Sequence, residues 1–117
     1  MSVNGRRLAV SAACADNNKG YVQVLDYDGK AKLWSQVGQI IVGQGNALVG
    51  YTLDLNSDGT RLAVSAPLAD AFVGNIKIFD LKTTPLQYCL IANFRGRLAR
   101  TSKGKIDMMR LVILVSN

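Results

Sequence analysis

The segment Asp58-Gly59-Thr60-Arg61-Leu62-Ala63-Val64-Ser65-Ala66 decides the fold, because it is a second copy of Asn4-Gly5-Arg6-Arg7-Leu8-Ala9-Val10-Ser11-Ala12. The two copies lie 54 positions apart, and the register continues without a gap beyond both segments. Between residues 4–28 and 58–82, 11 of 25 positions are identical. A repeat with a period in this range is typical of propellers and solenoids, in which each unit buries its faces against its neighbours.

Each copy has the pattern of short β-strands. Residues 7–12 and 61–66 follow Asn-Gly and Asp-Gly, which tolerate the positive φ of tight hairpin turns. Residues 21–25 and 75–79 place Val or Ile at every second position, as expected for a strand with one buried face. The sequence therefore predicts an antiparallel sheet from each copy.

Further strand-like runs complete the predicted units. Residues 51–55 alternate just before Asp58-Gly59 and form a hairpin with the strand that follows, while residues 33–37 and 86–91 supply outer strands. Four strands per unit is the count of a propeller blade. The predicted fold class is therefore all-β, with antiparallel propeller-type blades that form a partial propeller of about two four-stranded blades.

The repeat also divides the chain into predicted units. Residues 1–42 are a first blade unit that lacks its first strand, residues 43–92 are a second blade unit, and residues 93–117 are a basic, divergent tail. Two units cannot close a ring, and an open pair of blades leaves sheet faces and edges exposed. We therefore expect a fragment or one part of an assembly, with other blades or an oligomer partner beside it.

Several function classes are disfavoured by composition. Histidine is absent, which removes the commonest general base near neutral pH and the commonest metal ligand. Cys14 and Cys89 lie far apart and form no CxxC pair, so they indicate neither a disulfide framework nor a zinc site. The sequence predicts a protein that is not an enzyme. The alternative is a histidine-free propeller hydrolase or lyase that uses an acid and an arginine.

The positive charge is concentrated in the tail. Residues 1–82 carry 8 basic and 7 acidic side chains, whereas residues 83–117 carry 6 basic and 1 acidic. A basic tail is usually a solvated segment, and the alternative is that it binds nucleic acid. Its basic middle contains one aromatic residue, Phe94, too few to hold single strands by stacking. We expect no nucleic-acid partner; the alternative predicts binding that weakens with salt and needs residues 83–117.

No membrane or export signal is expected in this chain. No stretch approaches the roughly 18 apolar residues of a membrane-spanning helix, and no signal-peptide core follows Met1. The compartment is therefore unknown from these residues alone.

Residues 50–67, followed by residues 74–78, resemble the FG-GAP repeat of integrin α-chain-like β-propellers. The resemblance rests on four segments: Gly50-Tyr51, Leu53-Asp54-Leu55-Asn56-Ser57-Asp58-Gly59, the repeated strand with Ala66-Pro67, and Gly74-Asn75-Ile76-Lys77-Ile78. The resemblance covers about residues 4–82. It implies a seven-bladed or similar propeller, extracellular or on a cell surface, that serves adhesion or ligand binding. Some members of the family bind calcium in loops between strands.

One motif is a candidate metal site. Asp54, Asn56 and Asp58 satisfy the D-x-N-x-D-G start of a calcium loop, whose alternating oxygens suit a hard cation. They are candidate calcium ligands; no other cofactor is expected. The alternative is a plain hairpin turn at Asp58-Gly59 that Asn56 helps to shape.

Recurrent acidic residues and scattered aromatic residues are the remaining candidates. Asp16 and Asp70 recur in the loops, and Asp26 and Asp80 recur at strand ends, so we expect these carboxylates to bind loop amides, with ligand binding or acid-base chemistry as the alternative. The aromatic residues are expected to pack between blades, with stacking on a sugar as the alternative. They are Tyr21, Tyr27, Trp34 and Tyr51.

The predicted function is thus a non-enzymatic binding or scaffold module of FG-GAP-like propeller repeats in a larger cell-surface or secreted protein. Its ligand, a protein or a glycan, is unknown. A calcium-stabilised adhesion fragment is the first alternative.

Overall fold

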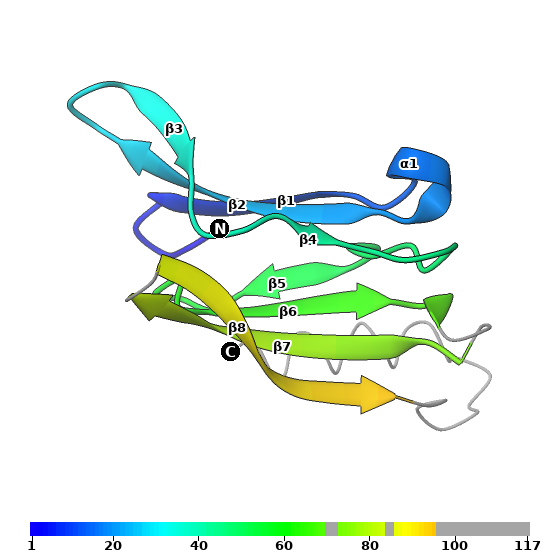
Figure 1. The fold of residues 1–117 in the computed structure, drawn as a ribbon. Coiled ribbons are helices and arrows are strands. Elements are labelled where there is room, and N and C mark those ends of the chain that lie inside the picture. Colours follow the sequence, from blue (N-terminus) through cyan, green and yellow to red (C-terminus); the bar gives the residue numbers. More distant parts are fainter. Residues whose placement is uncertain (70–72, 84–85, 96–117) are drawn as a thin grey trace.

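The structure, a computed structural model, describes residues 1–69, 73–83 and 86–95, which form two antiparallel sheets that lie face to face (Figure 1). The first sheet contains four strands, and a single short helical turn, α1 (Ala15–Asn18), lies between the first two of them. These strands are β1 (Arg7–Ala12), β2 (Tyr21–Asp28), β3 (Leu33–Gln36) and β4 (Ile41–Val42). The prediction of an outer strand over residues 33–37 is therefore met by β3, which ends one residue earlier.

The strands of the first sheet are arranged around β2. β1 pairs along one edge of β2, while β3 and the two-residue β4 pair with successive parts of its other edge. Within the described residues, β1 pairs with no strand besides β2. The first sheet is thus only three strands wide, and no described strand pairs with the other edge of β1, where Ser2 binds the backbone of Arg7.

The second sheet has the order β5-β6-β7-β8. Its strands are β5 (Leu53–Leu55), β6 (Arg61–Ala66), β7 (Asn75–Thr83) and β8 (Leu86–Arg95). β6 and β7 pair in the same register as β1 and β2: Arg61 lies opposite Asp80, as Arg7 lies opposite Asp26. The 54-residue repeat of the sequence is therefore also a repeat of strand pairing.

The prediction of an all-β chain with two four-stranded antiparallel sheets is confirmed. Assembly of the sheets as blades of a propeller stays a prediction. The predicted unit of residues 1–42 contains the whole first sheet, and the second sheet occupies residues 53–95. Of the expected tail, residues 96–117 lie outside the described residues.

The core lies between the two sheets and is made of alternate residues of each strand. Ala9, Val22 and Val24 face the core from the first sheet. Successive side chains of a strand point to opposite faces, so the neighbours of these residues point away from the core. The second sheet contributes Leu55, Leu62, Val64, Phe79 and Tyr88. Removal of these apolar surfaces from water is the main force that holds the sheets together.

Among the described residues, no helix has the length and apolar character needed to cross a membrane.

Candidate functional site

The predicted calcium ligands lie in and beside the turn between β5 and β6. Asn56 Oδ1 accepts a hydrogen bond from the backbone N–H of Arg61 at 2.8 Å. Asp58 Oδ1 accepts two, from the N–H of Thr60 at 3.1 Å and from its hydroxyl at 2.6 Å, and these bonds lower the pKa of Asp58. Asp54 lies on β5 opposite Ala63. The oxygens of Asn56 and Asp58 thus shape a hairpin turn.

Calcium binding at this turn stays a prediction. Within the described ranges, no group of three or more His, Cys, Asp or Glu side chains is placed to hold a metal ion. Both turn hydrogen bonds of Asp58 end on its Oδ1, so a cation bound through this oxygen would compete with Thr60.

If the turn does bind calcium, the melting temperature of the chain should rise with millimolar calcium, since a ligand that binds only the folded state stabilises it. The rise should disappear in Asp54→Ala. Thermal melting followed by circular dichroism, with magnesium as the control cation, measures this. An unchanged melting temperature in calcium would eliminate the site.

The same turn is tied to both sheets through the carbonyl oxygen of Gly59. Arg7 Nη1 donates to this oxygen at 2.9 Å from the first sheet, and the hydroxyl of Tyr88 donates to it at 2.8 Å from β8. Arg7 also forms a two-bond pair with Asp26, at 2.5 and 2.7 Å, which raises the pKa of Arg7. Tyr88 is fully buried, and burial raises its pKa. These contacts of Arg7 and Tyr88 with Gly59, here called the Gly59 junction, connect the two sheets.

The recurrent aspartates have a different partner from the one predicted. Asp80 binds Arg61 through two bonds, at 2.7 and 3.2 Å, which lower the pKa of Asp80 and repeat the Arg7–Asp26 pair of the first sheet. The prediction of binding to loop amides is therefore wrong for Asp26 and Asp80. The reason is that residues 7 and 61 lie directly across the sheet from these carboxylates, and a guanidinium group matches a carboxylate in shape and charge.

The loop aspartates are not part of this pairing. Asp16 forms an exposed ion pair with Lys19, at 3.1 Å, in the turn after β1. Asp70 lies outside the described residues.

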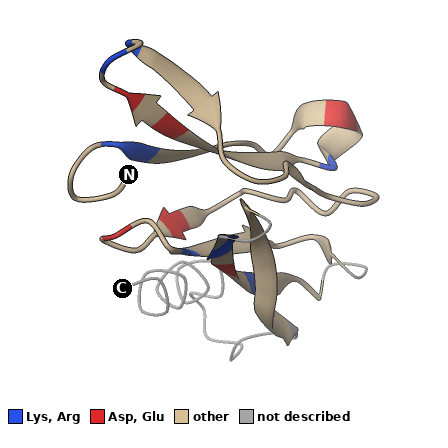
Figure 2. Ribbon diagram, turned by 60° about the vertical axis from the view of Figure 1, so that its left-hand side comes forward, with Lys and Arg blue, Asp and Glu red and all other residues tan. Residues whose placement is uncertain are grey.

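The side of the first sheet turned away from the second sheet, here called the outward face, is open and uncharged. It consists of alternate residues of the four strands: Leu8, Val10, Ala12, Tyr21, Gln23, Leu25, Tyr27, Trp34, Gln36 and Val42. Charged residues of this sheet lie toward strand ends and turns, and most of its ribbon is free of them (Figure 2). The exposed aromatic and aliphatic side chains of this face are suited to contact another surface.

The predicted packing of four aromatic residues between blades is not seen between these two sheets, and packing against a further blade stays a prediction. Tyr21, Tyr27, Trp34 and Tyr51 are all at least one-third exposed and do not pack between the sheets. Tyr27 and Trp34 instead lie together on the outward face, with ring centroids 5.2 Å apart. Among the described aromatic residues, Phe79 and Tyr88 pack in the core between the sheets. The sequence reasoning did not single out Tyr88. The repeat contained the signal, because Tyr88 is Trp34 shifted by 54 positions.

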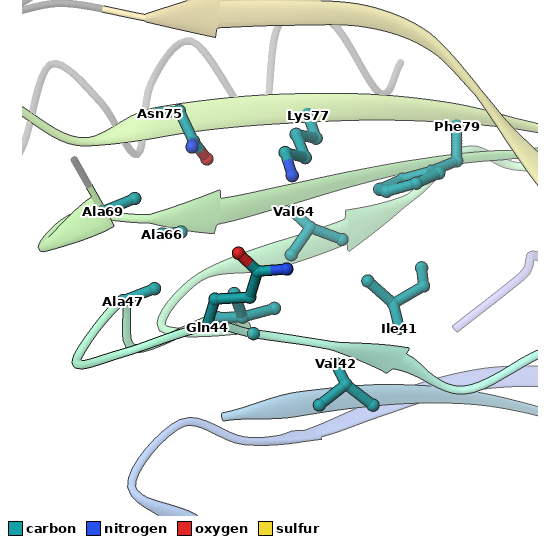
Figure 3. Close-up of a pocket in the computed structure, with 12 residues that line it drawn as sticks. Ile41, Val42, Gln44, Ala47, Val64, Ala66, Ala69, Asn75, Lys77 and Phe79 are labelled. Carbon is teal, nitrogen blue, oxygen red and sulfur yellow. The ribbon is translucent and has the colours of Figure 1, made fainter. Parts of the chain in front are cut away.

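A cavity of about 240 Å³ lies between the two sheets, at the end opposite the Gly59 junction (Figure 3). Gln44, Asn75 and Lys77 point into it, and Val64 and Phe79 form part of its apolar wall. Asn75 is buried, and its Oδ1 has no hydrogen-bond partner among the described residues. Its described lining residues offer hydrogen-bond donors and acceptors but no carboxylate, hydroxyl or thiol side chain, so they are suited to hold a small polar group.

No protein-family model matches the chain. No curated protein matches it either.

Proposed function

We propose that the chain is a non-enzymatic binding or scaffold module built of FG-GAP-like β-propeller repeats, in a larger cell-surface or secreted protein that serves adhesion or ligand binding. The repeat of sequence, strand register and Arg–Asp pairing supports its modular construction. One observation carries the binding role: the outward face is uncharged and rich in aromatic and aliphatic side chains, and it is open.

The composition of this face is that of a binding surface. The centre of a protein interface is enriched in Tyr and Trp and depleted of charged residues. Tyr27 and Trp34 form such a centre, and Gln23 and Gln36, joined by a 3.0 Å hydrogen bond, lie beside them on the same face. Aromatic rings with neighbouring amides suit either a protein surface or the apolar face of a glycan.

The carboxylates of the candidate site form hydrogen bonds and ion pairs that stabilise the fold, which does not favour a role in proton transfer. Asp26 and Asp80 are bound to arginines, and Asp58 is bound within its turn. A histidine-free hydrolase or lyase therefore remains the weaker alternative. Binding of nucleic acid by the tail stays an untested alternative, and residues 96–117 of that tail lie outside the described part of the chain.

The proposal is tested with the full chain on fluorescent beads, exposed to cultured cells and to a glycan array. We expect binding that is lost in Trp34→Lys, because the new charge lies in the centre of the outward face. Leu33→Lys is the matched control, since Leu33 is the exposed neighbour on β3 and points to the other side of the sheet. The proposal fails if neither surface is bound, or if the chain turns over a substrate in a way that depends on Asp54 or Asp58.

A further inference from the structure

The outward face has a buried counterpart in the second sheet. A shift of 54 positions converts Leu8, Val10, Leu25 and Trp34 into Leu62, Val64, Phe79 and Tyr88. The residues of the second sheet are 0%, 3%, 7% and 1% exposed, whereas Trp34 is 43% exposed and the other three are partly exposed. The same positions of one repeat are therefore covered in the second sheet and open in the first.

The strand register shows that these positions are equivalent in space as well as in sequence. Trp34 pairs with Tyr27 across β2 and β3, and Tyr88 pairs with Leu81 across β7 and β8. Both pairs are related by the same 54-position shift. The difference in exposure thus comes from what covers each sheet and not from a difference in strand pairing.

The cover of the second sheet is a face of the repeat itself. Ala9, Val22 and Val24 of the first sheet, all buried, pack with Leu62 and its neighbours in one core cluster. They are small or β-branched and form a shallow surface into which the larger side chains of the second sheet pack.

We propose that the outward face is a docking surface for a further unit of the same 54-residue repeat, which covers it with the face that Ala9, Val22 and Val24 present. This inference rests on the part of the proposed function that makes the chain a module of repeat units, and it names the partner of the outward face. The partner is recognised by its shape and its apolar surface, because the outward face carries no charge.

A polar contact provides the register of docking. Arg7 reaches from the covering sheet to the carbonyl oxygen of Gly59 in the turn of the covered sheet. The counterpart of Gly59 is Gly5, which has a similar backbone, with φ of 70° against 76°. A docked unit would place its own copy of Arg7 at the carbonyl oxygen of Gly5.

A second folded copy of this chain does not offer the required face. The counterparts of Ala9, Val22 and Val24 in the second sheet are Ala63, Ile76 and Ile78. Their exposures are 0%, 0% and 1%, so this face is already buried in the chain. The partner must therefore be a repeat unit whose corresponding face is free.

The test is a fusion in which an added copy of residues 1–54 precedes Met1, so that Asp54 of the added copy is joined to Met1. Residue 1 is the counterpart of residue 55, so this junction continues the repeat without a gap. In the original chain, Leu53 and Asp54 pair with β6, which is the repeat counterpart of β1. The fusion brings a copy of these two residues to the same edge of β1. Trp34→Phe in the added copy leaves the original Trp34 as the only tryptophan.

We expect the fluorescence of Trp34 to shift to shorter wavelength in the fusion, and its quenching by acrylamide to fall below that in the single chain. The matched control is the same fusion with Val22→Lys and Val24→Lys in the added copy, which places charge on the docking face and leaves the original chain intact. In this control, Trp34 should be as accessible as in the single chain.

Equal quenching of Trp34 in the fusion and in the single chain would overturn the proposal. So would an added unit that stays unfolded beside an intact original chain, because docking should stabilise it. If the single chain self-associates with rising concentration and Trp34→Lys abolishes this, the occupant of the outward face is a second copy of the chain and the proposal is wrong. If a glycan protects Trp34 from quenching and the fusion does not, the occupant is a sugar and the proposal is also wrong. The bead assay is a separate experiment. If the beads bind neither cells nor glycans while Trp34 is protected in the fusion, the proposed ligand binding is refuted and the docking proposal stands.

Discussion

Tyr88→Ala is expected to lower the free energy of unfolding by about 3–5 kcal/mol, the usual cost of truncating a buried aromatic residue. Tyr88 is 1% exposed, contacts the core between the sheets, and donates its hydroxyl to the carbonyl oxygen of Gly59. The substitution leaves a cavity and removes one of the two donors at that oxygen. A domain of ordinary stability has only about 5–15 kcal/mol, so much of the chain should unfold at moderate urea concentrations.

Urea unfolding followed by far-ultraviolet circular dichroism measures this loss. Trp34→Ala, the same truncation at the repeat-equivalent position, should cost less than about 1 kcal/mol, as substitutions at exposed positions do. Tyr88→Phe keeps the ring and should cost about 1 kcal/mol for the lost hydrogen bond. Similar losses in Tyr88→Ala and Trp34→Ala would contradict the burial difference on which the docking proposal depends.

Gly20→Ala is the second large effect, with an expected loss of about 2–6 kcal/mol from backbone strain and overpacking together. Gly20 has φ of 78°, which L side chains rarely adopt, and a Cβ there would lie 2.2 Å from the carbonyl oxygen of Val49. Both obstacles are backbone, so neither can be relieved by a side-chain rotation. Loss of native structure below the melting temperature of the unaltered chain is the expected result.

Gly45→Ala separates the two causes, because Gly45 also has a positive φ, 57°, but a Cβ there would meet no atom within 4 Å. It should cost only the strain of the left-handed conformation, about 1–2 kcal/mol. Thermal melting of both variants gives the comparison. If Gly20→Ala is no more destabilising than Gly45→Ala, the close approach of residues 20 and 49 is not a constraint on the fold.

The β-strands could be predicted because their signals are local. Val22 and Val24 alternate with polar or aromatic neighbours, and both are buried as a period of two requires. Asp58-Gly59 forms the predicted turn, with Gly59 at a positive φ. The second sheet has the predicted four strands. The first sheet has the three strands predicted for a unit that lacks its first strand, and in addition β4, which was not predicted.

The candidate site was harder to predict, because its contacts join residues far apart in sequence. Nothing local to Asp26 indicates that it binds Arg7, and nothing local to Gly59 indicates that Arg7 and Tyr88 both donate to its carbonyl oxygen. The pairing of Tyr27 with Trp34 likewise depends on the register between two strands. Such contacts follow from the arrangement of the sheets and not from the pattern of any one strand.

The sequence by itself determined the strands, their turns and the equivalence of the two units, since each depends on side-chain alternation, on glycine conformation or on the 54-residue period. Only the tertiary structure decided which copy of each position is buried. Trp34 and Tyr88 are equivalent in the repeat, yet one is exposed and the other fully buried. The physical reason is that burial depends on whether another sheet lies against a face, and within the described residues the second sheet has the first sheet as its cover, while the outward face of the first has none.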